Sequence, residues 1–129
     1  MENRNFPVGC VIMASGLAVR FGSNKLLADF GGRPLLCRAL DVTDTPALAA
    51  RVVVTRSAEV KALCEGLGVP SLLHALPGRN DTVRLGLDAL LEQCPALAGC
   101  IFLPGDQPLL RRETLEAMIG AFARTQKET

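Results

Sequence analysis

The sequence predicts an α/β fold in which a parallel sheet is covered by helices on both faces. Short apolar runs rich in β-branched residues alternate with longer amphipathic stretches along the chain. Four such runs are each followed by a helical pattern, and parallel neighbours need crossover connections of this kind. Right-handed crossovers then place helices on both faces of the sheet. With 129 residues, we expect a single domain over residues 1–129.

The first two predicted strands are each followed by a helix with a recognisable start. Residues 8–13 form a β-branched apolar run, which is typical of a buried strand. The helical pattern at residues 34–42 opens on a proline, which suits a first turn whose N–H groups have no intrahelical partner. Residues 51–55 predict the second strand. Ser57 then caps a helix over residues 58–67.

The last two units repeat this alternation. Residues 70–74 predict a weaker third strand, and Asn80 or Asp81 caps the helix that follows. Residues 99–103 predict the fourth strand, and residues 113–124 the last helix. Apolar residues recur at helical spacing in these two helices, at Val83, Leu87, Leu90 and Leu91 in the first and at Leu115, Met118, Ile119 and Phe122 in the second.

The composition is that of an ordinary globular protein. Apolar residues make up 49% and charged residues 21% of the chain, which excludes a disordered polypeptide. The formal net charge of +1 indicates neither a nucleic-acid surface nor a membrane anchor. No apolar run reaches the length of a membrane span, and no signal-peptide pattern is present, so we expect a cytoplasmic protein. The five cysteines form no CxxC pair, and we expect buried, reduced thiols.

The favoured strand order is 3-2-1-4, that of a doubly wound, Rossmann-like, three-layer fold. This order makes strands one and four neighbours at the switch point of the sheet. Ligands of such sheets bind at that crevice, outside the carboxyl ends of the strands. The segments that follow Met13 and Leu103 are therefore the candidates for a binding site.

The segment after the first strand combines small residues with two cations. Ala14, Ser15 and Gly16 let a ligand approach the backbone closely, and backbone N–H groups in such a loop can cradle phosphate oxygens. Arg20 and Lys25 add positive charge that suits a triphosphate. Neither the dinucleotide nor the P-loop fingerprint is present. The alternative is a plain surface loop with two solvated cations.

The segment after the fourth strand places Asp106 in a turn stiffened by two prolines. A carboxylate opposite a cationic phosphate loop suits Mg²⁺, which prefers one or two carboxylates together with phosphates and water. The alternative is that Asp106 only caps the turn. A third segment, residues 78–84, could hold a base or ribose, although helix capping explains its polar residues equally well.

Together these segments resemble the MobA-like nucleotidyltransferases, and most closely the molybdenum cofactor cytidylyltransferases. Residues 13–27 resemble the nucleotide-binding signature of the family, and residues 105–108 resemble its Mg²⁺-binding segment. Residues 78–87 are similar to a third family segment, with Thr82 in place of a serine. Ser15 stands where cytidylyl members carry alanine and guanylyl members glycine, and its bulk favours CTP.

The resemblance implies a fold of the nucleotide-diphospho-sugar transferase type and a role for each matching residue. The implied catalytic residues are Arg20, Lys25 and Asp106, with Asp106 as the Mg²⁺ ligand. The implied nucleotide contacts come from Ala14, Ser15, Gly16, Gly78, Thr82 and Gln107. The implied reaction transfers CMP or GMP from a nucleoside triphosphate to a molybdopterin-type acceptor and releases pyrophosphate.

Two alternatives stay open at the level of function. One is a related transferase that acts on a sugar phosphate or an isoprenoid precursor, and the other is a nucleotide-binding remnant without turnover. Family members usually continue for some tens of residues, so we expect this chain to be the N-terminal part of the family fold, truncated at its C-terminus. Strand four then lies at a sheet edge, where we expect self-association into a homo-oligomer or an exposed apolar patch.

Overall fold

The computed structural model describes residues 7–14, 19–20, 23–76, 79–106 and 110–128, which form one central parallel sheet with helices on both faces. The sheet consists of β1 (Val8–Ala14), β6 (Ala50–Thr55), β7 (Ser71–Leu73) and β8 (Gly99–Pro104). The strand order is β7-β6-β1-β8, with every pair parallel. This is the predicted order 3-2-1-4, and it confirms the doubly wound fold class.

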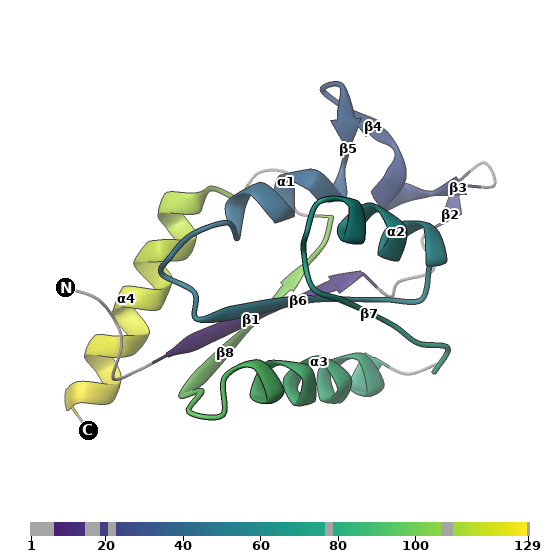
Figure 1. The fold of residues 1–129 in the computed structure, drawn as a ribbon. Coiled ribbons are helices and arrows are strands. Elements are labelled where there is room, and N and C mark those ends of the chain that lie inside the picture. The colour runs from purple at the N-terminus through teal and green to yellow at the C-terminus, as the bar shows by residue number, and fades with distance from the viewer. Residues whose placement is uncertain (1–6, 15–18, 21–22, 77–78, 107–109, 129) are drawn as a thin grey trace.

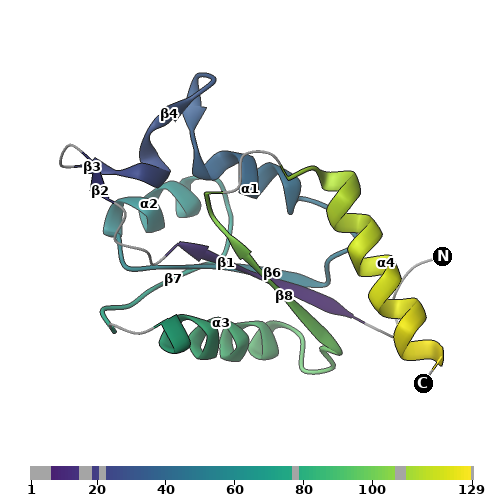
Figure 2. The ribbon, with the colours of Figure 1, turned by 180° about the vertical axis from the view of Figure 1, so that it is seen from behind.

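Among the described residues, four helices cover the sheet. They are α1 (Leu36–Val42), α2 (Ala58–Gly66), α3 (Arg79–Gln93) and α4 (Arg112–Glu128). The helices α1 and α2 lie on one face and α3 lies on the other (Figure 1), while α4 crosses the sheet near the start of β1, on the side of α1 (Figure 2). In the part of the chain that the structure describes, no helix is long and apolar enough to cross a membrane.

The sheet has an aliphatic core on each face, because alternate residues of each strand point to opposite faces. Cys10 and Ile12 of β1 pack in the cluster that contains residues of α1 and α2, such as Leu36. Val11 packs on the opposite face with Leu90 of α3. All five of these residues are fully buried.

Helix α3 sits close to the sheet because Gly86 has no side chain. A Cβ atom at this position would lie 2.6 Å from Val11 Cγ1 and 2.8 Å from Val11 Cγ2. The face of α3 that contacts the sheet is therefore the one with Gly86 and Leu90. Leu87 and Leu91 share the helical spacing of Leu90 but are 36% and 40% exposed, so the apolar pattern does not by itself mark the buried face of α3. Of the residues that share the apolar spacing in α4, Leu115 and Ile119 are buried, whereas Met118 is exposed.

The stretch between β1 and α1 contains two small hairpins that the sequence did not predict. The first pairs β2 (Val19–Arg20) with β3 (Ser23–Asn24), and the second pairs β4 (Asp29–Phe30) with β5 (Arg33–Pro34). The short 3₁₀ helix η1 (Lys25–Leu27) connects them. Each hairpin has only two residues in each strand, which is too short for an alternating pattern to show.

Pro34 does not open α1 as predicted. Gly31 and Gly32, with φ of 66° and 90°, form the turn of the second hairpin and fold the chain back on itself. Pro34 consequently ends β5, and the N–H of Leu35 still donates to the carbonyl of Ala28 at 2.9 Å. The helix begins only at Leu36.

Of the other predicted helix boundaries, one is confirmed and two are wrong. Ser57 caps α2 as predicted, because its Oγ accepts a hydrogen bond from the N–H of Val60 at 3.2 Å. Helix α3 begins at Arg79, so Asn80 and Asp81 lie in its first turn and are not its N-cap. Helix α4 continues to residue 128 instead of ending near residue 124.

The five cysteines are free thiols, as predicted. Cys94 and Cys100 are only half-buried, whereas the other three are buried. Burial raises the pKa of Cys10 to about 12 and that of Cys64 to about 11. Such thiols stay protonated at neutral pH, which makes them poor nucleophiles.

Candidate functional site

The strands β1 and β8 end side by side, at the edge of the sheet where the sequence predicts a binding site. Their register pairs Met13 with Pro104, and the N–H of Gly105 donates to the carbonyl of Met13 at 2.9 Å. A Cβ atom at Gly105 would lie 3.1 Å from Leu36 Cδ1 and 3.3 Å from the Met13 oxygen, so a side chain here would force these neighbours to move by a few tenths of an ångström. Asp106, half-buried, therefore follows a residue that is tied to the end of β1.

Thr55 ties β1 to β6 at the same edge. Its Oγ1 donates to the carbonyl of Ala14 at 3.0 Å and accepts from the N–H of Ser57 at 3.0 Å. The side chain of Thr55 is fully buried. Thr55 is not among the predicted site residues, although a polar residue that ends an apolar strand at the carboxyl edge was the available signal. Its contacts hold Ala14, where the predicted phosphate loop begins.

A third set of contacts joins β7 to the first turn of α3. The backbone N–H of His74 donates to the carbonyl of Thr55 at 3.0 Å, and His74 Nδ1 accepts from the N–H of Leu76 at 3.1 Å. His74 Nε2 lies 3.5 Å from Thr82 Oγ1, and Thr82 is buried. Hydrogen bonds thus run across the carboxyl edge from Ala14 through Thr55 and His74 to Thr82.

The structure describes only some of the remaining predicted site residues. Arg20 lies in β2, and Lys25 opens η1, so both belong to the chain between β1 and α1. Other predicted nucleotide contacts lie outside the described residues, namely Ser15, Gly16, Gly78 and Gln107. The roles of all these residues stay predictions.

At Asp106 the structure offers one carboxylate, a ligand of the kind that hard divalent cations prefer. Among the described residues, no group of three or more His, Cys, Asp or Glu side chains could hold a metal. A closed structural metal site needs such a group. A single carboxylate in a crevice instead fits Mg²⁺, which completes its coordination with phosphate oxygens and water. The residues present are therefore compatible with a cation that arrives together with a phosphate ligand.

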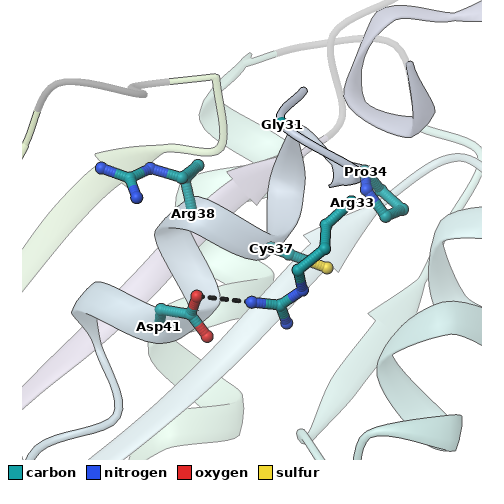
Figure 3. A pocket seen from close by; sticks show the side chains of 6 residues that line it. All are labelled: Gly31, Arg33, Pro34, Cys37, Arg38 and Asp41. Carbon is teal, nitrogen blue, oxygen red and sulfur yellow. Dashed lines mark hydrogen bonds and ion pairs between the residues drawn. The ribbon is translucent and has the colours of Figure 1, made fainter. Parts of the chain in front are cut away.

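A small hollow lies outside this edge, between the second hairpin and α1 (Figure 3). It has a volume of about 170 Å³ and is lined by Gly31, Arg33, Pro34, Cys37, Arg38 and Asp41. Arg33 Nη1 lies 2.7 Å from Asp41 Oδ2, and this hydrogen bond raises the pKa of Arg33. Ligand pockets usually measure about 300–1,000 Å³, so we do not place a nucleotide in this hollow.

The strand order β7-β6-β1-β8 places this chain in the doubly wound α/β class, in which ligands generally bind at the switch point of the sheet. Residues 10–129 match the family model "MobA-like NTP transferase domain". The chain belongs to this family, which confirms the resemblance found in the sequence.

Three relatives show how broad the surrounding group is. The bifunctional protein GlmU of Anaeromyxobacter sp. strain K is 34% identical over 98% of this chain and 27% of its own length. The 3-deoxy-manno-octulosonate cytidylyltransferase of Polynucleobacter necessarius is 31% identical over 87% of this chain and 44% of its own length. The probable molybdenum cofactor guanylyltransferase of Pyrococcus horikoshii is 26% identical over 90% and 57%. This chain therefore spans less than half the length of the first two relatives.

Solved structures share the fold. Rv0371c of Mycobacterium tuberculosis superposes with a TM-score of 0.76 at 23% identity, covering 92% of this chain and 62% of that protein. A CMP:2-keto-3-deoxy-manno-octonic acid synthetase, solved in complex with CTP, superposes with a TM-score of 0.68 at 19% identity, covering 89% and 46%. These structural neighbours confirm a fold of the nucleotide-diphospho-sugar transferase type.

Proposed function

We propose that this chain binds a nucleoside triphosphate, with CTP favoured, along the carboxyl edge of its sheet and transfers the nucleotidyl group to an acceptor. The observation that carries the proposal is the junction of β1 with β8. The hydrogen bond between Gly105 and Met13 brings Asp106 next to the start of the small-residue loop. Membership in the NTP transferase family and a structural neighbour solved with CTP support the choice of ligand.

The order of residues along the edge supports an elongated ligand. Asp106 follows β8, Ala14 ends β1, Thr55 ends β6, and His74 follows β7. Neighbouring strands are about 4.8 Å apart, so three spacings extend over roughly 14 Å. We place the phosphates at the β1–β8 end, with Arg20 and Lys25, and the base or ribose near Thr82 at the β7–α3 end.

The proposed reaction is an in-line displacement at the α-phosphorus. An oxygen of the acceptor forms the new bond to the α-phosphorus while the bond to the bridging oxygen of the β-phosphate breaks. Pyrophosphate leaves; an acceptor phosphate attacks through an ionised oxygen, whereas an acceptor hydroxyl releases its proton to solvent. Arg20 and Lys25 stabilise charge on the departing pyrophosphate, and the fold holds the reactants in line. Asp106 would hold a Mg²⁺ ion, which when bound neutralises phosphate charge.

The acceptor is the finer part of the proposal. We favour a molybdopterin-type acceptor because the sequence signatures resemble the molybdenum cofactor cytidylyltransferases, and a probable guanylyltransferase of that cofactor is a relative. A sugar-type acceptor is the second candidate. The higher identity to a 3-deoxy-manno-octulosonate cytidylyltransferase, 31% against 26%, favours this alternative.

Calorimetry with CTP, GTP, UTP and ATP, each with and without Mg²⁺, tests the proposal. We expect Mg²⁺-dependent binding that is strongest for CTP and is lost in Asp106→Asn. The matched control is Asp88→Asn, which changes an exposed carboxylate of α3 and should bind like the unmodified chain. Equal Mg²⁺ dependence in Asp106→Asn would show that Asp106 is only a turn residue. No binding of any triphosphate would refute the proposed function.

Pyrophosphate release then separates the acceptors. The assay uses CTP and Mg²⁺ with molybdopterin, with 3-deoxy-manno-octulosonate, and with a sugar phosphate. Release with molybdopterin alone would support the favoured acceptor, and release with a sugar-type acceptor the second candidate. Binding of CTP without turnover on any acceptor would instead favour the nucleotide-binding remnant.

A further inference from the structure

The surroundings of His74 determine which of its ring nitrogens carries the proton. The backbone N–H of Leu76 donates to His74 Nδ1 at 3.1 Å. A ring nitrogen that accepts a hydrogen bond carries no proton, so the neutral imidazole holds its proton on Nε2. The backbone of His74 is held as well, because its N–H donates to the carbonyl of Thr55. The ring is therefore anchored at the β6–β7 edge in one tautomer.

The protonated nitrogen faces a buried hydroxyl group. His74 Nε2 lies 3.5 Å from Thr82 Oγ1, and only 4% of Thr82 is exposed. With the proton on Nε2, His74 is the donor and the Thr82 oxygen is the acceptor. A threonine hydroxyl has one proton of its own, and this proton must then point away from the ring. The direction in which Thr82 can donate is thus set by His74.

We infer that His74 is a positioning residue that makes Thr82 a hydrogen-bond donor to the nucleotide. The inference rests on the proposed function, which places the base or ribose at the first turn of α3. The group that Thr82 would then contact is an acceptor, such as the carbonyl oxygen or the bare ring nitrogen of a pyrimidine like cytosine. An amino group at the same place would face a second donor and would be disfavoured. His74 therefore contributes to base selection without touching the base.

The tautomer can be measured without any nucleotide. His74 is the single histidine of the chain, so its imidazole resonances need no assignment among several rings. Long-range ¹H–¹⁵N spectra of the ¹⁵N-labelled chain at a pH where the ring is neutral should show Nδ1 without a proton and Nε2 with one. A proton on Nδ1, or fast exchange between the two tautomers, would overturn the inference.

A double-mutant cycle tests whether His74 acts through Thr82. The four proteins are the unmodified chain, His74→Asn, Thr82→Val and the double variant. Asparagine at 74 can still accept a hydrogen bond from the N–H two residues on, so it preserves the bond to Leu76 and removes the contact with Thr82. We expect His74→Asn to weaken Mg²⁺–CTP binding by about three- to tenfold, the range for one neutral hydrogen bond. In the Thr82→Val background the same change should have no effect.

The outcomes separate this inference from the proposed function. Unweakened CTP binding in His74→Asn would show that His74 only holds its loop, as would equal losses in both backgrounds. Either result would overturn the inference and leave the proposed function standing. A chain with the expected tautomer that binds no triphosphate would refute the proposed function, and the role of His74 with it.

Discussion

Replacement of Gly86 by alanine tests the close contact between α3 and the sheet. The new Cβ atom would lie 2.6 and 2.8 Å from the two Cγ atoms of Val11 and 3.2 Å from Val54 Cγ2. Ordinary carbon–carbon contacts measure about 3.5–4.0 Å, so α3 must move away by roughly 1 Å. Val11 cannot yield easily, since it is fully buried in the central strand and a β-branched side chain is stiff.

Two opposing terms set the size of the effect. Overpacking of this kind costs about 1–3 kcal/mol, and three short contacts favour the upper part of that range. Alanine stabilises a helix relative to glycine by about 1 kcal/mol. We therefore expect Gly86→Ala to lower the free energy of unfolding by about 1–2 kcal/mol. For a chain of this length that corresponds to a decrease in Tm of roughly 3–8 °C.

Urea and thermal unfolding measure this change, and two further variants control for it. Gly66→Ala places the same methyl group in α2, where no atom lies within 4 Å, and should be neutral or slightly stabilising. Val11→Ala removes both clashing atoms, so the double variant Gly86→Ala/Val11→Ala should lose less stability than the sum of the single variants. A Gly86→Ala chain as stable as the unmodified chain would refute the close packing of α3 on the sheet.

The remaining predictions concern Lys25, Cys10 and the edge strand β8. Lys25→Ala should weaken CTP binding about ten- to hundredfold and CMP binding much less, because a charge-assisted hydrogen bond to the outer phosphates is lost; equal losses for both nucleotides in calorimetry would contradict this placement. The pKa of Cys10 is raised by burial from 9.0 to about 12, so its contribution to stability is complete below pH 9 and is lost as the pH rises toward 12. Urea unfolding between pH 8 and 11 should show this loss, and Cys10→Ala should reduce its slope. Finally, β8 is an edge of the described sheet and carries half-buried Ile101 and Phe102, so sedimentation should show self-association or a hydrophobic dye should bind; a monomer that binds no dye would argue against an exposed apolar edge.

The strand order could be predicted from the sequence because each strand and each connection carries a signal in its own local sequence. Each strand is a short apolar run, each connection is long enough for a helix, and right-handed crossovers leave few topologies. The cap at Ser57 is likewise a property of one residue and its neighbours. The leucine pattern of α3 was misleading, because the helix presents Gly86 to the sheet, and a residue without a side chain contributes nothing to an apolar pattern.

The site could be predicted only as far as each segment carries its own signal. The small-residue loop and Asp106 stand out because they follow strands that the topology makes neighbours. Thr55 and His74 join segments far apart in the chain, and a hydrogen bond between Thr55 Oγ1 and the Ala14 carbonyl leaves no mark in either local sequence. Such contacts emerge only when the strands are placed side by side.

The measurement that tests the central claim most directly is the paramagnetic effect of Mn²⁺ on the backbone amide resonances of the ¹⁵N-labelled chain, with and without CTP. A structural neighbour, Rv0371C, has been solved as a manganese complex. Mn²⁺ with CTP should broaden the amides of Gly105 and Asp106 at the carboxyl edge and leave Gly99, at the opposite end of β8, sharp. Asp106→Asn should abolish the broadening. Broadening centred elsewhere, or no dependence on CTP, would contradict a nucleotide and metal site at the junction of β1 and β8.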